Sequence, residues 1–247
     1  MTIAFRVPAV PDFNDDDLAA RVQRRLDAKT KPLGSLGRLE ALAVQIALVQ
    51  GRERPRLESP QLVVFAGDHG IAAQGVSAYP AEVTAQMVVN MLAGGAAVSV
   101  LARQHGIALH VADVGVGSAL AVSEARPGTQ FHPLKVAPGT ADASLGPAMS
   151  EAACAQAMAR GAALVARLPG RVVLLGEMGI GNSSAAALLL ARLAGLPLDA
   201  CVGRGTGLDD AGLARKTAVL ARVLARSWDA PSRIPVQPLP PRAPHRR

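Results

Sequence analysis

The segment spanning residues 172–193 constrains the fold of this chain more than any other part of the sequence. It begins with the aliphatic run Val172–Leu175, which is typical of a fully buried β-strand. It ends with the Ala/Leu-rich run Ala185–Leu193, which is typical of a helix, and glycines separate the two. A strand that passes through a tight turn into a helix is the repeating unit of parallel α/β sheets, so we expect such a sheet here.

The same alternation extends over most of the chain, after two helices expected at Asp15–Ala28, behind an Asn14 or Asp15 cap, and at Leu36–Val49. Strands are expected at Leu62–Ala66, Ala108–Val114, Val172–Leu175 and near Ala200. Helices are expected at Ala81–Leu92, Ala96–His105, Met149–Leu168, Ser183–Leu193 and Leu208–Arg226. This order predicts an α/β fold with a mostly parallel sheet that has helices on both faces.

The glycine turn after Leu175 has the chemistry of an anion-binding site. Glycines let backbone N–H groups approach a ligand, Asn182 or Ser183 can cap the next helix, and a helix N-terminus favours an anion. Glu177 comes at the carboxyl end of the strand, where open α/β sheets bind ligands. The turn matches neither the Walker sequence nor the dinucleotide fingerprint. The alternative is a plain tight turn in which Glu177 is a solvated loop residue.

Asp68 and His69 follow the expected strand at Leu62–Ala66. Because adjacent side chains of an extended backbone point apart, a direct Asp–His dyad is not expected. Each is a candidate for holding a ligand, and histidine is suited to proton transfer near neutral pH. The alternative is a structural role in a His–Gly turn.

Tyr79 and Gln86 flank the start of an expected helix. An aromatic surface beside an amide suits a planar heterocycle, although a Tyr–Pro pair also fits a plain helix start. Gly203 and Gly205 lie in a second glycine-rich loop, which can hold a phosphate or simply connect two elements.

A cation is available to this second loop from Arg204 or from Lys216. Since the carboxyl ends of parallel strands meet at one edge of a sheet, we expect all these loops to share one crevice.

Composition argues against several partners. The formal charge of +7 and pI near 10.4 would favour nucleic acid, but the cations are spread out and a single Tyr and a single Trp offer no stacking surface. No apolar run reaches the roughly 18 residues of a membrane span, and Met1–Arg6 lacks the features of a signal peptide, so we expect a cytoplasmic protein. Cys154 and Cys201 have no metal-binding spacing and are expected to be buried free thiols.

Four motifs together resemble one enzyme family: Lys31–Glu40, Ala66–Gly70, Val76–Pro80 and Gly176–Asn182. The family is that of nicotinate-nucleotide–dimethylbenzimidazole phosphoribosyltransferase, and the resemblance covers roughly residues 15–226. It implies transfer of phosphoribose from nicotinate mononucleotide to 5,6-dimethylbenzimidazole, giving α-ribazole 5′-phosphate and nicotinate, in cobalamin nucleotide-loop assembly. No cofactor or metal is implied.

The resemblance also implies roles for single residues. Tyr79, Gln86 and Met178 would lie around the benzimidazole, and Glu177 would lie beside the reacting centre. There a carboxylate stabilises the positive charge that develops on C1′ and the ribose oxygen. The nucleotide phosphate would be held by Gly179, Gly181, Asn182, Ser183, Gly203, Gly205 and Lys216.

The architecture implied by the resemblance is a Rossmann-like α/β domain and a small helical domain drawn from both chain ends, in a homodimer. We therefore expect helices of the small domain in residues 1–58, an incomplete nucleotide-binding α/β domain in 59–226, and a disordered Pro/Arg-rich tail in 227–247. Family members are longer, and no counterpart of their general-base glutamate follows Arg226. The alternative function is thus a truncated, catalytically impaired protein that binds the nucleotide or the benzimidazole.

Overall fold

The computed structural model describes residues 9–122 and 125–226, and the tail predicted at 227–247 lies outside them. The strands are β1 (Gln61–Gly67), β2 (Ala108–Gly115), β3 (Thr129–Pro133) and β4 (Val173–Met178). The helices are α1 (Asp16–Asp27), α2 (Arg38–Gln50), the 3₁₀ helix η1 (Gly70–Gln74), α3 (Val83–Ala93), α4 (Ala97–Gln104), α5 (Glu151–Val165), α6 (Asn182–Ala194), α7 (Leu198–Cys201) and α8 (Asp210–Ala225).

The four strands form one sheet in the order β3-β2-β1-β4, and all neighbouring pairs are parallel. The predicted parallel α/β fold is therefore confirmed. The chain runs from β1 outward to β2 and β3, then returns to place β4 on the other side of β1. The carboxyl ends of β1 and β4 thus flank the point where the strand order reverses, which is where open α/β sheets bind ligands.

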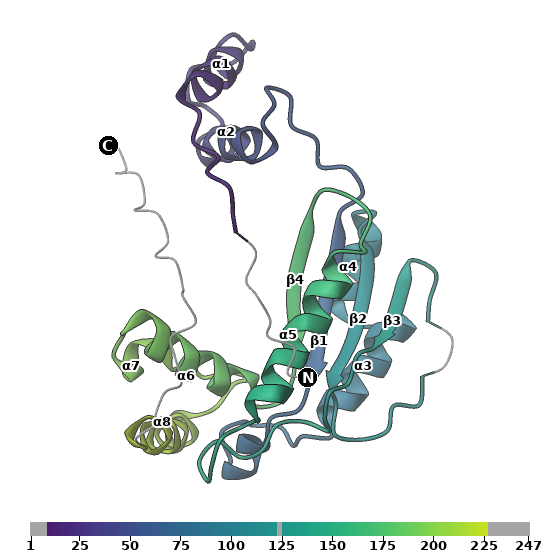
Figure 1. Cartoon of the computed structure of the whole chain (residues 1–247), viewed down its shortest axis with the longest axis vertical. Coiled ribbons are helices and arrows are strands. Elements are labelled where there is room, and N and C mark those ends of the chain that lie inside the picture. The colour runs from purple at the N-terminus through teal and green to yellow at the C-terminus, as the bar shows by residue number, and fades with distance from the viewer. Residues whose placement is uncertain (1–8, 123–124, 227–247) are drawn as a thin grey trace.

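Helices cover both faces of the sheet, as predicted (Figure 1). On one face, Val64 and Val111 pack in a cluster with Val88 of α3 and Ala102 of α4. On the other face, the alternate strand residues contact α5 through Leu164. Successive side chains of a strand point to opposite faces, so each strand contributes to both clusters.

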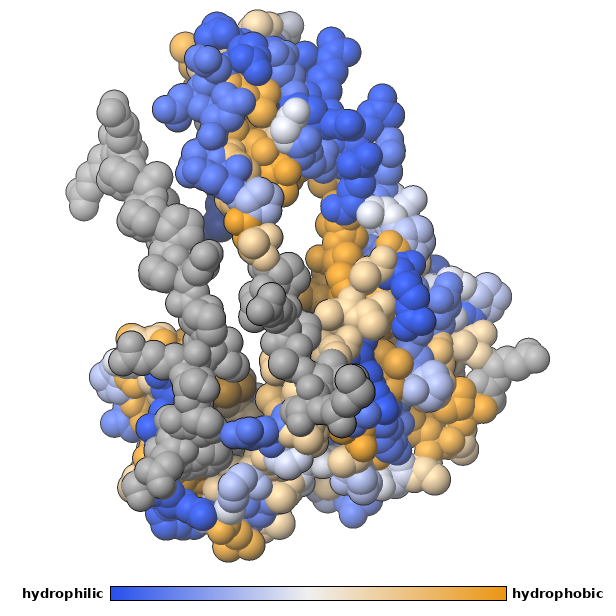
Figure 2. Space-filling view, in the orientation of Figure 1, coloured by the Kyte–Doolittle hydropathy of each residue, from blue (hydrophilic) through white to orange (hydrophobic). Residues whose placement is uncertain are grey.

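Strand β4 differs from the prediction of a fully buried strand, because Leu175 is 71% exposed. Strand β4 lies at the edge of the sheet and pairs only with β1 among the described residues. The side chain of Leu175 shares a face with Val63, its register partner, but α5 does not reach across to cover β4. Figure 2 shows a hydrophobic strip at the surface in the region of β4.

Two other elements depart from the expected pattern. The strand expected near Ala200 is instead the short helix α7. Strand β3 was not predicted, and it adds to the sheet beside β2. The cysteines are free, as expected, but both are only partly buried.

The first two helices pack on each other through Leu18, Val22, Leu26 and Ala47. Asp15 caps α1, with its carboxylate accepting from Leu18 N at 2.8 Å, which confirms one of the two predicted caps. The motif that links the helices contains a nearly buried ion pair, Lys31 Nζ to Glu40 Oε1 at 2.8 Å. The Lys31 ammonium and the Leu36 N–H both donate to the Glu40 carboxylate, and these two hydrogen bonds lower the pKa of Glu40.

One segment of the described chain, Val83–Gln104, is long and apolar enough to span a membrane by length and composition, contrary to the expectation from the sequence. The structure breaks it into α3 and α4, because Gly94 ends α3 in the left-handed region with φ 83°. Both helices contribute buried residues to the core against the sheet. Core helices of globular proteins can be equally long and apolar, so we interpret the segment as a pair of core helices.

Candidate functional site

The turn between β4 and α6 lies at the reversal of strand order. The residue at the N-cap of α6 is Gly181, with φ 93°, so the predicted capping by Asn182 or Ser183 is wrong. Residues with a side chain rarely adopt this φ, which explains why position 181 is a glycine. No side-chain cap accepts from the first turn of α6 in the described structure. The positive end of the helix is therefore left for another acceptor.

Close packing shapes the same turn. A Cβ at Gly179 would overlap the Gly67 carbonyl oxygen, so only glycine fits there. The next residue, Ile180, donates its N–H to the hydroxyl of the fully buried Thr84 at 3.1 Å. Thr84 belongs to α3, and sequence reasoning assigned it no role. The turn is thus fixed from both sides, by the end of β1 and by the start of α3.

Lys216 joins the turn to the second glycine loop. Its Nζ donates to Ser183 Oγ at 2.9 Å and to the Gly203 carbonyl at 3.0 Å. Gly205 lies beside both, since a Cβ there would be 2.8 Å from Ser183 Oγ and 3.4 Å from Lys216 Nζ. Four residues predicted to hold a phosphate are therefore in one cluster, although the loop follows helix α7 rather than a strand.

The Lys216 side chain is fully buried. Within residues 9–122 and 125–226, no carboxylate forms an ion pair with it. Burial lowers the pKa of its ammonium group because the charged form loses water. A buried cation without a nearby carboxylate is well suited to receive an anionic ligand.

The loop that carries Tyr79 reaches this cluster. Ser77 Oγ lies 3.1 Å from Thr206 Oγ1, and Arg215 donates to the Gly75 carbonyl at 3.0 Å. Tyr79 itself is 54% exposed.

The other residues assigned to a benzimidazole lie differently. Gln86 is exposed on α3, and Met178 packs against the core cluster beneath that helix.

Glu177 is exposed near the carboxyl end of β4. Its register partner is Phe65, so both side chains point to the face that α5 only partly covers. Asn182, the first residue of α6, is partly buried and lies close enough to His69 to influence its pKa.

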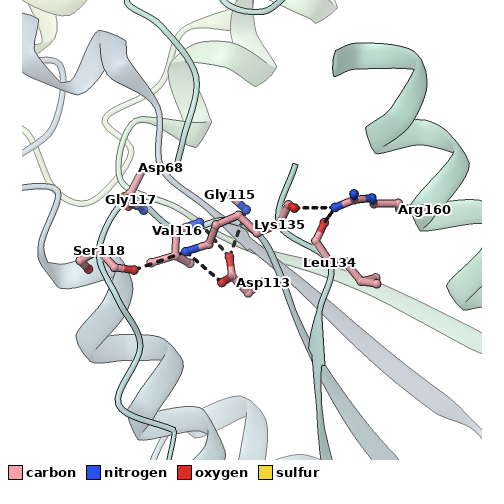
Figure 3. Close-up of polar contacts among 9 residues, drawn as sticks. All are labelled: Asp68, Asp113, Gly115, Val116, Gly117, Ser118, Leu134, Lys135 and Arg160. Carbon is pink, nitrogen blue, oxygen red and sulfur yellow. Dashed lines mark hydrogen bonds and ion pairs between the residues drawn. The ribbon is translucent and has the colours of Figure 1, made fainter. Parts of the chain in front are cut away.

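A second part of the site surrounds Asp68. Its Oδ2 accepts the Gly117 N–H at 2.6 Å. Both residues are labelled in Figure 3. Asp68 and His69 line a cleft of about 620 Å³ with Ser118, Thr140 and other loop residues. In the described residues, two buried side-chain oxygens have no hydrogen-bond partner, Asp68 Oδ1 and Ser184 Oγ. Such atoms are rare in folded proteins, and both occur in segments that follow β1 and β4.

Asp113, at the end of β2, holds the neighbouring loop. It accepts from Val116 N at 2.9 Å and pairs with Lys135 Nζ at 3.3 Å (Figure 3). Arg160 of α5 donates to the carbonyls of Leu134 and Lys135. These contacts are structural. The described residues contain no group of three His, Cys, Asp or Glu side chains that could hold a metal ion.

Fold and site together define an α/β protein with a parallel sheet. Near the point where its strand order reverses lie the N-terminus of α6, which has no side-chain cap in the described residues, and the buried Lys216. The chain belongs to a phosphoribosyltransferase family, since residues 12–239 match the family model described as "DBI_PRT: Phosphoribosyltransferase". The match runs past Arg226, where the resemblance seen in the sequence ends.

Two similar proteins carry the name nicotinate-nucleotide–dimethylbenzimidazole phosphoribosyltransferase. The protein of that name from Variovorax paradoxus is 63% identical over 219 residues, covering 89% of this chain and 61% of the relative. The one from Cupriavidus taiwanensis is 55% identical, covering 93% and 65%. The crystal structure of CobT from Thermus thermophilus is 44% identical with a TM-score of 0.77, covering 86% and 63%. The chain therefore spans between 61% and 65% of the length of these relatives.

Proposed function

We propose that this chain acts in the transfer of phosphoribose from nicotinate mononucleotide to 5,6-dimethylbenzimidazole, which yields α-ribazole 5′-phosphate and nicotinate. The names of its relatives support this reaction. The observation that carries the proposal is the buried Lys216 ammonium beside Ser183 in the first turn of α6. A helix N-terminus and a buried cation provide the two features that a phosphate monoester requires.

The phosphate cluster in this proposal consists of the turn after β4 and the loop before α8. Gly179, Gly181, Asn182 and Ser183 supply the turn, while Gly203, Gly205 and Lys216 supply the loop. Fixed donors need no reorganisation when the ligand binds, so they hold the ribose in one orientation. The strand order β3-β2-β1-β4 supports a Rossmann-like arrangement for this nucleotide site.

Glu177 is proposed as the carboxylate beside the reacting centre. It comes two residues before Gly179, so a sugar whose phosphate lies in the cluster can place C1′ near this side chain. As the bond to nicotinate breaks, positive charge grows on C1′ and the ribose oxygen, and an anionic oxygen stabilises it. Tyr79, Gln86 and Met178 are proposed to hold the incoming benzimidazole against that carbon.

The remaining assignments are proposals on the same basis. We infer a homodimer located in the cytoplasm, with residues 1–58 in a small helical domain and residues 59–226 in a nucleotide-binding domain. The α1–α2 cluster supports the first boundary, because its buried residues form a group of their own.

Release of nicotinate tests the proposed reaction. Purified protein is mixed with nicotinate mononucleotide and dimethylbenzimidazole, and free nicotinate is followed by chromatography, with a sample lacking the benzimidazole as control. We expect release that requires both substrates, together with calorimetric binding of the mononucleotide. Binding without release would instead favour the impaired binding protein, and absence of both would contradict the proposal.

A further inference from the structure

The two residues that follow β1, Asp68 and His69, have different neighbours, because β1 lies between β2 and β4. Asp68 is held by the loops on the β2 side. Its N–H donates to the Gly115 carbonyl at 2.9 Å, its carbonyl accepts from Thr140 N at 3.0 Å, and its carboxylate accepts from Gly117 N. His69, the next residue, forms a backbone bridge with Thr140, while its side chain contacts the turn that follows β4.

His69 is in van der Waals contact with the turn that precedes α6. A Cβ at Gly181 would lie 3.1 Å from His69 Cβ, and a Cβ at Gly179 would lie 3.3 Å from His69 Cδ2. Gly181 also has a φ of 93°, so neither position accepts a side chain without a shift. The His69 side chain therefore forms part of the surface against which the turn packs, together with Gly67 and Ala72.

Asn182, the first residue of α6, lies close enough to the ring to influence its pKa. Burial lowers the pKa of His69, while the Asn182 side chain and the charge of Asp68 act in the opposite direction. The charged groups that share its cleft are Asp68 and Glu82. A neutral imidazole carries one donor and one acceptor nitrogen, which suits it to orient an amide side chain.

We propose that His69 is a positioning residue that holds the Gly179–Asn182 turn in the conformation that directs the N-terminus of α6 toward a phosphate. The proposal deepens the proposed function and depends on it for the identity of the ligand. In this role His69 contacts the turn and not the reacting atoms. Its removal lowers affinity for the phosphate group and leaves affinity for the base and sugar unchanged.

The first experiment compares His69→Ala, His69→Gln and the exposed control His105→Ala. Calorimetry measures the Kd of nicotinate mononucleotide and of nicotinate riboside, which lacks the phosphate. We expect His69→Ala to weaken the mononucleotide about tenfold, a loss of about 1.4 kcal/mol, and the riboside by less than about twofold. His69→Gln should recover most of the loss because its amide retains one donor and one acceptor. His105→Ala should change neither.

Amide hydrogen exchange of the free protein supplies a second measurement that needs no ligand. His69→Ala should speed exchange in residues 179–184 while the amides of β2 keep their protection. If the native protein binds neither ligand, the proposed function fails, and the exchange result alone decides about His69. Unchanged exchange in the turn would overturn the inference. An equal loss of affinity for both ligands, or general loss of protection, would also overturn it by showing that the ring only stabilises the fold.

Discussion

Lys216 Nζ lies 2.9 Å from Ser183 Oγ and so joins α8 to the first turn of α6. The two residues are 33 positions apart in the sequence. The ammonium donates to one hydroxyl and one carbonyl, which leaves a third proton for another acceptor. A buried charge is unfavourable when its partners are neutral, so this contact is better suited to binding than to stability.

Substitution Lys216→Met should separate the two properties. We expect affinity for ribose 5-phosphate to fall at least about tenfold, because a charged hydrogen bond contributes about 1.5–3 kcal/mol. The free energy of unfolding should stay equal or rise by up to about 1 kcal/mol, because a buried cation is replaced by an apolar group of similar length. Calorimetry and urea unfolding measure the two effects. Lys29→Met, at an exposed position, is the control, and a clear loss of stability in Lys216→Met would count against the assignment.

Substitution Glu177→Gln should affect turnover more than binding. The carboxylate contributes most when positive charge develops, so we expect nicotinate release to slow at least about tenfold while the Kd of nicotinate mononucleotide changes less than about threefold. Initial rates and calorimetry give the comparison. Glu151→Gln, on the exposed first turn of α5, serves as the control. Equal losses in rate and binding would exclude the proposed role.

Two glycine loops in the site should respond differently to alanine. Gly179→Ala forces its Cβ toward the Gly67 carbonyl, and we expect the free energy of unfolding to fall by about 2 kcal/mol or more. Gly203→Ala meets no atom within 4 Å and should stay within about 0.5 kcal/mol of the native protein. Urea unfolding of both variants is the measurement. Equal stability of the two would show that the turn relaxes freely.

Beneath α5, the sheet contains a polar network that sequence reasoning did not find. His110 is 2% exposed, and its Nε2 lies 2.8 Å from Gln61 Oε1. Gln61 donates its amide to the Ser59 carbonyl, so its oxygen faces His110 and accepts from Nε2. Nδ1 of His110 is then an acceptor for Nε2 of His132, at 3.0 Å. His110, with one donor and one acceptor nitrogen, is therefore neutral in this arrangement.

This network predicts a dependence of stability on pH. Burial is the main cause that lowers the pKa of His110 and of His132 below the ordinary value of 6.5. Their stabilising contribution is therefore complete above that value, and it decreases as the pH falls because the unfolded chain takes up protons first. The slope is at most about 1.4 kcal/mol per pH unit for each histidine.

Urea unfolding between about pH 7.5 and 5.5, on either side of the ordinary histidine pKa, measures this slope. His132→Gln should reduce it relative to the native protein, since one of the two titrating rings is removed. His105→Gln, at an exposed position outside the network, should leave the slope unchanged. A native slope equal to that of His132→Gln would contradict the prediction.

Much of the secondary structure follows from local patterns. The Asp15 cap, the alternation of strands and helices, and the bounds of α3, α5 and α8 agree with the sequence to within a few residues. The elements that were predicted wrongly or not at all depend on tertiary contacts. Strand β3 is short and polar, and its pairing with β2 stabilises it. The segment at α7 packs against α6 and α8, which favours a helix over a strand.

Sequence alone determined the fold class of this protein, because periodicity and glycine placement are local properties. Tertiary structure alone decided which of the candidate site residues contact one another. It placed Lys216 against Ser183, His69 beneath the turn of α6, and Glu177 on an exposed edge strand. Such contacts depend on strand order and on helix packing, and neither is encoded in the spacing of a single motif.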